Sequence, residues 1–235
     1  MKTAHNPRHP SIAAIVPATD EPPTLTAALD SLTSGSDAPD AVVPVLECSR
    51  PGPAAARNHG AASVTEDVLL FVDADVLVAA DAVARIRRRF AEDAELSAVF
   101  GAYDDDPSER DVVSRFRNLL HHHVHAEAPG SAGTFWSGIG AVRRAHFERV
   151  GGFDAGRFPR ASVEDVDLGS RLTAGGLRVE LDPAITGRHA KRWTLASMVA
   201  TDLLWRGIPW ARLVLEGRAA PRGLNLGPRH RLSPL

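Results

Sequence analysis

The sequence lacks the features that mark secreted, membrane-spanning and nucleic-acid-binding proteins. Its 235 residues include a single cysteine, Cys48, which excludes an intramolecular disulfide and fits a reducing compartment. No stretch approaches the roughly 18 consecutive apolar residues that span a bilayer, and residues 1–10 contain no apolar signal-peptide core. A formal net charge of −2 argues against general nucleic-acid binding. These absences predict a soluble protein in the cytoplasm.

The charge that is present is unevenly divided. Residues 186–235 hold nine Lys and Arg against two Asp and Glu, whereas residues 1–185 hold eighteen against twenty-seven. A basic C-terminus on an acidic body indicates contact with membrane headgroups or with a phosphate-bearing substrate, unless the arginines are merely solvated. Trp205, Trp210 and residues 213–215 lie among these arginines in an amphipathic helical pattern, which either rests on a membrane surface or packs on the domain.

The rest of the sequence is organised around one apolar run, from Val68 to Val72, that leads directly into Asp73 and Asp75. A continuous run of this length is typical of a fully buried strand in a largely parallel sheet. Such sheets bind ligands at the carboxyl ends of their strands, where both carboxylates lie. Carboxylate oxygens suit magnesium or manganese and, through the metal, a diphosphate. The alternative is a solvated turn in which an Asp caps the following helix.

Apolar segments alternate with helical patterns along most of the chain. This alternation, with short connections, predicts an α/β domain with a mostly parallel central sheet flanked by helices. The expected strands cover residues 11–17, 41–46, 68–72, 96–103 and 177–181. The expected helices cover residues 24–34, 54–63, 81–90, 108–126, 143–150 and 194–205, with one more beginning near Ser162.

Two clusters of polar residues lie on the later helices. His121, His122, His123 and His125 are nearly consecutive, so on a helix they point in different directions and are better explained as a polar face than as a metal site. Residues 162–167 instead combine Ser162, a potential helix cap, with three acids in four residues. Three acids exceed what a cap requires, so a carboxylate here would suit a general base.

The ordered set of motifs resembles the family 2 glycosyltransferases, inverting enzymes of GT-A fold (the Rossmann-like nucleotide-diphospho-sugar transferase fold). The resemblance covers about residues 11–205 and implies a short tail at 1–10, a single GT-A domain at 11–205 and an amphipathic, basic extension at 206–235. The motifs are Pro17-Ala18 with Asp20-Glu21, residues 55–60, the Asp73-Ala74-Asp75 triplet, Ser137-Gly138 with residues 151–154, Glu164-Asp165 and Arg192-Trp193.

The resemblance also implies a role for each matching residue. Asp165 would be the catalytic base, and Asp75 and His189 would hold Mn²⁺ or Mg²⁺. The nucleotide-sugar would contact Pro17, Ala18, Asp20, Glu21, Glu47, Arg57, Asn58, Asp73 and Ala74. The acceptor or sugar pocket would include Trp136, Ser137, Gly138, Glu164, Arg192 and Trp193.

These roles imply a metal-dependent, inverting transfer of a sugar from a nucleoside-diphosphate sugar to an acceptor hydroxyl. Two motifs depart from the family: Glu47-Cys48-Ser49-Arg50 replaces Asp-Asp-Gly-Ser, and the Gln of Gln-x-x-Arg-Trp is missing before Arg192-Trp193. The first departure leaves open a degenerate domain that binds a nucleotide or a partner without transfer, and the second argues against processive synthesis. A sugar-nucleotide-forming nucleotidyltransferase would carry a glycine- and arginine-rich loop after the first strand, unlike residues 18–21. The chain would also suit the catalytic part of a membrane-tethered enzyme with a lipid-linked acceptor.

Overall fold

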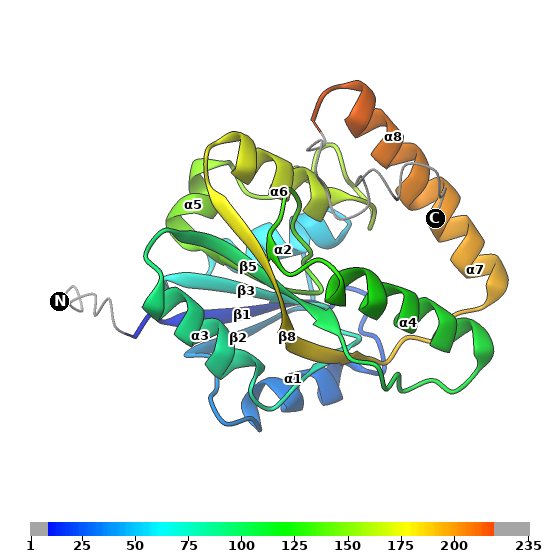
Figure 1. Ribbon diagram of the computed structural model, residues 1–235, viewed down its shortest axis with the longest axis horizontal. Helices are drawn as coiled ribbons and strands as arrows, with labels where there is room; N and C mark the ends of the chain where they lie inside the picture. Colours follow the sequence, from blue (N-terminus) through cyan, green and yellow to red (C-terminus); the bar gives the residue numbers. More distant parts are fainter. Residues whose placement is uncertain (1–8, 219–235) are drawn as a thin grey trace.

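The computed structural model describes residues 9–218, so the tail before residue 9 and the basic segment after residue 218 lie outside the described residues. An eight-stranded sheet with the order β2-β1-β3-β7-β5-β8-β4, plus β6 paired to β8, forms the centre (Figure 1). The strands are β1 (Ile12–Pro17), β2 (Ala41–Val45), β3 (Val68–Val72), β4 (Val76–Val78), β5 (Leu96–Tyr103), β6 (Gly130–Ser131), β7 (Ile139–Arg143) and β8 (Arg178–His189). The helices are α1 (Leu25–Thr33), α2 (Pro53–Ala62), α3 (Ala82–Glu92), α4 (Val112–Ala126), α5 (Arg144–Arg149), α6 (Glu164–Ala174), α7 (Leu195–Ala200), the π-helix η1 (Thr201–Gly207) and α8 (Ile208–Leu215).

The α/β architecture is confirmed, but the prediction of a mostly parallel sheet is wrong in its details. Among the described strands, three pairs are parallel (β1 with β2, β1 with β3, and β5 with β8) and four are antiparallel. The change of direction comes from β7, which lies antiparallel between β3 and β5. The strand order nevertheless leaves the carboxyl ends of β1, β2 and β3 at one edge, as the sequence predicts.

Helices cover both faces of the sheet, because alternate side chains of its buried strands point to opposite faces. All five residues of β3 are buried. Leu70 packs in one apolar cluster with Leu32 of α1 and Ile86 of α3, whereas Phe71 packs in the other with residues of α2, α5 and α6. Figure 1 shows α1 and α3 on one side of the sheet and α2, α5 and α6 on the other. This double coverage fixes the strand ends from which the site is built.

A helical arm of three consecutive segments, α7, η1 and α8, follows β8 (Figure 1). Thr194 begins it with a capping box in which the Thr194 and Ser197 side chains and backbones bond reciprocally. Most of its side chains are exposed, and between residues 195 and 215 only Leu213 is buried. The arm crosses residue 205, where the sequence predicts a domain boundary, and that boundary stays a prediction. No helix within residues 9–218 is long and apolar enough to cross a membrane.

Candidate active site

The two acidic residues after β3 lie at the edge of the sheet beside the end of β8. The Asp73 amide donates to the Gly138 carbonyl (3.2 Å), and the Ala190 amide donates to the Asp75 carbonyl (2.8 Å), so both flanking segments fix the turn. His189, the last residue of β8, places Nε2 3.6 Å from Oδ2 of Asp75. Burial disfavours ionised Asp75, but the adjacent His189 and the charge of Lys191 outweigh it and lower the pKa of Asp75. Asp75 is therefore an anionic carboxylate beside an imidazole.

Arg57 of α2 joins the edge carboxylates to the start of α6. Its side chain is buried, with Nη2 2.6 Å from Oδ1 of Asp73 and Nη1 2.9 Å from Oε1 of Glu164. Although burial favours the neutral guanidine, the two carboxylates outweigh it and raise the pKa of Arg57. The other Glu164 oxygen, Oε2, accepts from the Ser162 amide (2.8 Å). Residues 57, 73 and 164 thus form one ionic bridge, buried at Arg57 and Glu164 and half-buried at Asp73, which sequence spacing alone does not reveal.

Asp165 is the second residue of α6 and follows Glu164 of this bridge. Burial and the charge of Glu164 raise the pKa of Asp165 to about 6, against the opposing charges of Arg57 and Arg206. Its Oδ1 accepts from the Val166 amide (2.8 Å), and its Oδ2 accepts a longer bond from the Ser137 amide (3.4 Å). A carboxylate that titrates near neutral pH at the mouth of a site can act as a general base.

The expected role of Ser162 as the cap of this helix is wrong. Val163 occupies the cap position, and no side chain bonds there. The Ser162 hydroxyl instead donates to the Trp205 carbonyl in the helical arm (2.5 Å). The acids of the first turn are still favourable to the helix, because its N-terminus carries partial positive charge.

The segment from Trp136 to Gly138 lies between the acids of β3 and α6. Ser137 and Gly138 are buried, and their backbones bond to Asp165 and Asp73 respectively. A Cβ at Gly138 would lie 2.2 Å from the Trp136 ring, so only glycine fits this position. The segment predicted as an acceptor pocket therefore bridges the two acidic sides of the site.

A cluster of aromatic side chains packs against the His189 imidazole. Tyr103, at the end of β5, stacks on His189 with centroids 4.4 Å apart and planes inclined by 12°. Trp136 contacts Tyr103 edge-on (4.9 Å), and His121 lies against both rings. His125 bonds through Nδ1 to the Gly101 carbonyl (2.9 Å). Two of the four histidines thus pack in this cluster, and neither Tyr103 nor its partnership with His189 is foreseen from the sequence.

The residues expected to hold the base and ribose follow β1 and β2. Ala18 is buried and its amide bonds to the Val45 carbonyl (3.0 Å), which ties the two strand ends together. Asp20, Glu21 and Glu47 are exposed beyond them. Glu21 has φ +43°, a left-handed conformation uncommon for a residue with a side chain and often found at functional loops. The loop is open to a ligand, with Pro17 half-buried at its base.

Of four further residues expected at the site, three lie outside the acidic turn. Asn58 bonds through its amide group to both backbone groups of Phe153 (2.8 and 2.9 Å). Trp193 is buried, with its amide on the Ser114 hydroxyl (2.8 Å), and Arg192 is exposed beside it. Ala74 is buried, and its carbonyl accepts from the Thr24 hydroxyl (2.7 Å). Among these, only Ala74 lies within the acidic turn itself.

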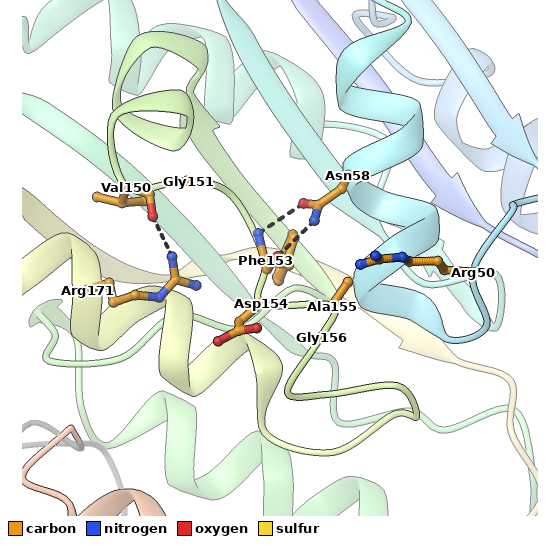
Figure 2. A pocket seen from close by; sticks show the side chains of 9 residues that line it. All are labelled: Arg50, Asn58, Val150, Gly151, Phe153, Asp154, Ala155, Gly156 and Arg171. Atoms are coloured by element: carbon orange, nitrogen blue, oxygen red, sulfur yellow. Dashed lines mark hydrogen bonds between the residues drawn. The ribbon is translucent and has the colours of Figure 1, made fainter.

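A separate cavity of about 350 Å³ lies between the loop after α5 and the helices α2 and α6 (Figure 2). Arg50, Asp154 and Arg171 give it charge, and Figure 2 shows Asp154 between the two guanidinium groups in this view. Its lining includes Asn58 but none of the edge acids. The lining residues are Arg50, Asn58, Val150, Gly151, Phe153, Asp154, Ala155, Gly156 and Arg171.

Comparison with known proteins agrees with this geometry. Residues 38–151, which include Arg57, Asp73 and Asp75, match the sequence model of glycosyl transferase family 2. The match covers just under half of this chain and supports a family 2 glycosyltransferase. A pre-mycofactocin glycosyltransferase of Mycobacterium tuberculosis is 29% identical over 168 residues, which is 66% of this chain and 34% of that relative. The chain thus spans about a third of the length of the curated relative it matches.

Solved structures confirm the GT-A fold. A mannosyltransferase from Pyrobaculum calidifontis, in complex with GDP-Man and Mn²⁺, matches 99% of this chain and 73% of its own, with TM-score 0.67 and 19% identity. GalNAc-T7 with UDP, GalNAc and Mn²⁺ matches 80% of this chain and 45% of its own, with TM-score 0.59 and 14% identity. Staphylococcus aureus TarS 1–349 with UDP-GlcNAc matches 81% and 61%, with TM-score 0.56 and 15% identity.

Proposed function

We propose that this chain is a metal-dependent, inverting glycosyltransferase that moves a sugar from a nucleoside-diphosphate sugar to an acceptor hydroxyl. One observation carries the proposal. Asp165, a carboxylate with a raised pKa, and the acidic turn from Asp73 to Asp75, which suits a metal-bound diphosphate, meet at one edge of the sheet. Arg57 joins the two, because it pairs with Asp73 on one side and with the Glu164 neighbour of Asp165 on the other. The match to family 2 and the neighbours with nucleotide-sugars bound support a glycosyltransferase that uses a nucleotide-sugar donor.

The donor occupies the edge formed by the ends of β1, β2 and β3. Pro17, Ala18 and the exposed Asp20-Glu21 loop take the base and ribose, with Glu47 beside them. The diphosphate lies over the acidic turn, where two half-buried carboxylates need a neighbouring cation. The pKa of Asp73 indicates this need. Burial and the charge of Asp75 raise it, although the adjacent Arg57 acts to lower it.

The residues present fit a divalent cation. Asp75 Oδ2 and His189 Nε2 lie 3.6 Å apart, which allows both to reach one ion about 2 Å from each. Hard cations of this size use one or two protein ligands and substrate phosphates, and imidazole suits manganese better than magnesium. Neighbours with Mn²⁺ bound support the same assignment. When bound, the metal would neutralise charge on the departing nucleoside diphosphate.

Asp165 performs the proton transfer. Its ionised carboxylate takes the proton of the acceptor hydroxyl, and the acceptor oxygen forms a bond to the anomeric carbon from the face opposite the diphosphate. The bond from that carbon to the diphosphate oxygen breaks with its electron pair, so the configuration inverts. With a pKa of about 6, Asp165 is ionised at neutral pH and still basic enough to accept the proton of the acceptor hydroxyl.

The helical arm gives the proposed enzyme a contact with an anionic membrane, where a lipid-linked acceptor would lie. Its outer surface exposes large apolar side chains, at Leu195, Val199, Leu203, Leu204, Trp205, Ile208, Val214 and Leu215. Exposed cations at Arg192 and Arg212 border them, whereas the acids Asp202 and Glu216 are neutralised by Arg117 and Arg157. An apolar surface bordered by exposed cations complements anionic headgroups.

A binding panel tests the function. UDP, GDP, ADP, CDP and dTDP are titrated against the protein by calorimetry, each with Mn²⁺ and with EDTA. We expect one diphosphate to bind only with the metal, and Asp75→Ala to weaken it at least tenfold. Asp30→Ala, an exposed acid on α1, serves as the control and should change nothing. Failure of all five diphosphates at millimolar concentration would refute the transferase proposal.

The preferred donor then allows the catalytic step to be measured. Asp165→Asn should lower transfer by about 10²–10⁴-fold, the usual contribution of a general base, with nucleotide affinity unchanged. Equal losses of binding and transfer would exclude Asp165 as the base. A catalytically degenerate domain would bind the diphosphate in the first panel but release no sugar product from any acceptor.

A further inference from the structure

The His189 imidazole lacks the hydrogen bond that usually orients a metal-binding histidine. In most metal sites the ring nitrogen away from the metal donates to a carboxylate or a carbonyl, which fixes the plane of the ring. Within residues 9–218, Nδ1 of His189 forms no hydrogen bond. The backbone is fixed, because His189 pairs with Val76 of β4 and the next amide bonds to the Asp75 carbonyl (2.8 Å). The side chain can still rotate about its own bonds, so packing must set the ring plane.

Tyr103 provides this packing. Its ring stacks on the imidazole with centroids 4.4 Å apart and planes inclined by 12°, and both side chains are buried. Among the described residues, no other aromatic ring contacts His189. A nearly parallel stack restricts rotation of the imidazole, because turning the ring would drive its edge into the phenol. The lone pair of an imidazole nitrogen lies in the ring plane, so the stack also determines the direction in which Nε2 can bind a cation.

The Tyr103 ring is itself held by its surroundings. The parallel pairing of β5 with β8 places Tyr103 beside Gly187, two residues before His189. Trp136 meets the Tyr103 ring edge-on at 4.9 Å and 88°, and His121 lies against it at 4.3 Å and 39°. Edge-to-face and offset contacts at these distances are favourable for aromatic rings. The orientation of Tyr103 is therefore set by the fold, and the stack passes it on to the imidazole.

We propose that Tyr103 is a positioning residue of the metal site. Its ring holds the His189 imidazole in the orientation in which Nε2, 3.6 Å from Oδ2 of Asp75, reaches the same divalent cation as that carboxylate. The stack replaces the hydrogen bond that a metal-binding histidine ordinarily makes through its second nitrogen. The aromatic face of Tyr103, and not its hydroxyl, carries this role. This inference rests on the proposed function and adds to its metal site a residue that acts only through His189.

Manganese affinity tests the proposal without an activity assay. Mn²⁺ is titrated into the full chain in the presence of its preferred nucleoside diphosphate, and free Mn²⁺ is followed by electron paramagnetic resonance. Tyr103→Met and Tyr103→Leu remove the ring and should weaken Mn²⁺ binding by about tenfold or more, whereas Tyr103→Phe should stay within about threefold of wild type. Phe100→Leu is the matched control, because Phe100 is buried in the same strand but contacts His125 and Phe135 instead. It should lower Tm and leave Mn²⁺ affinity unchanged.

A double-mutant cycle shows whether Tyr103 acts through the imidazole. In a His189→Ala background, Tyr103→Met should change Mn²⁺ affinity by less than about twofold, since the group it positions is gone. The same large loss in both backgrounds would overturn the inference, as would wild-type Mn²⁺ affinity in both ring-less variants. A loss in Tyr103→Phe equal to that in Tyr103→Met would also overturn it, because the hydroxyl would then carry the effect. Failure of the wild type to bind Mn²⁺ with any diphosphate would instead contradict the proposed function.

Discussion

Replacing Asp165 with asparagine should stabilise the protein at neutral and alkaline pH. Burial and the neighbouring Glu164 raise the pKa of Asp165 from its ordinary 3.8 to about 6, so the folded state holds its ionised form unfavourably. Above pH 6 the carboxylate is ionised in both the folded and unfolded states, and the folded state bears the full cost. Below pH 3.8 it is protonated in both, and the cost disappears. Asparagine resembles the protonated form at every pH.

The size of the effect follows from the pKa difference. About two pKa units correspond to about 3 kcal/mol of unfolding free energy at pH 8, and to about half of that at pH 5. Asparagine can keep the bond from the Val166 amide but loses the 3.4 Å bond from the Ser137 amide. That loss costs about 0.5–1 kcal/mol. The net gain is therefore about 2 kcal/mol at pH 8, or about 4–8 °C in Tm for a chain of this size.

Urea unfolding at pH 8 and pH 5, followed by far-UV circular dichroism, measures the gain. Asp167→Asn is the matched control, because Asp167 is buried in the same helical turn but pairs with Arg171 (2.7 Å) and Arg218 (3.0 Å). It should lower stability at both pH values, since it removes an attraction. An Asp165→Asn variant no more stable than wild type at pH 8, or a gain that does not shrink at pH 5, would refute the reasoning.

Three other substitutions test the bridge, the tight segment and the arm. Arg57→Met should cost about 3–5 kcal/mol in urea unfolding, because it leaves two carboxylates unpaired, and a loss below 1 kcal/mol would show that water reaches them. Gly138→Ala should cost about 1–3 kcal/mol through its clash with a tryptophan ring, whereas Gly156→Ala, whose added Cβ meets only ordinary contacts, should be nearly neutral. The double variant Leu204→Glu/Ile208→Glu should lose co-sedimentation with anionic phosphatidylserine vesicles without loss of Tm; equal sedimentation of wild type with neutral vesicles would contradict the charge argument.

The sequence predicts most elements because hydrophobic periodicity is a local property. The expected strand at 96–103 and helix at 54–63 agree with β5 and α2 to within a residue. β7 is missed because Ile139 to Arg143 follows a glycine-rich stretch and becomes a strand only by pairing between β3 and β5. Its antiparallel direction cannot be read from alternating strands and helices.

Residues of the candidate site could be predicted where they form a short motif in the sequence. They could not be predicted where the fold brings distant residues into contact. Asp73, Asp75 and Asp165 stand out because acids follow a buried strand or begin a helix. The pairing of Arg57 with Glu164 joins residues 107 positions apart, and the stacking of Tyr103 on His189 depends on the pairing of β5 with β8. Such contacts come from the fold, so single-sequence patterns contain no signal for them.

One electrostatic imbalance accounts for both proposed chemical properties of the site. The carboxylates of Asp73, Glu164 and Asp165 act on the buried guanidinium of Arg57, and Asp75 adds a fourth negative charge beside Asp73. Burial together with this excess negative charge disfavours ionised Asp165 and raises its pKa to about 6. The same excess favours a divalent cation at Asp75. Because Arg57 touches the carboxylates on both sides, neutralising it would change the base and the metal side together, whereas a change at Asp165 alone should leave nucleotide binding intact.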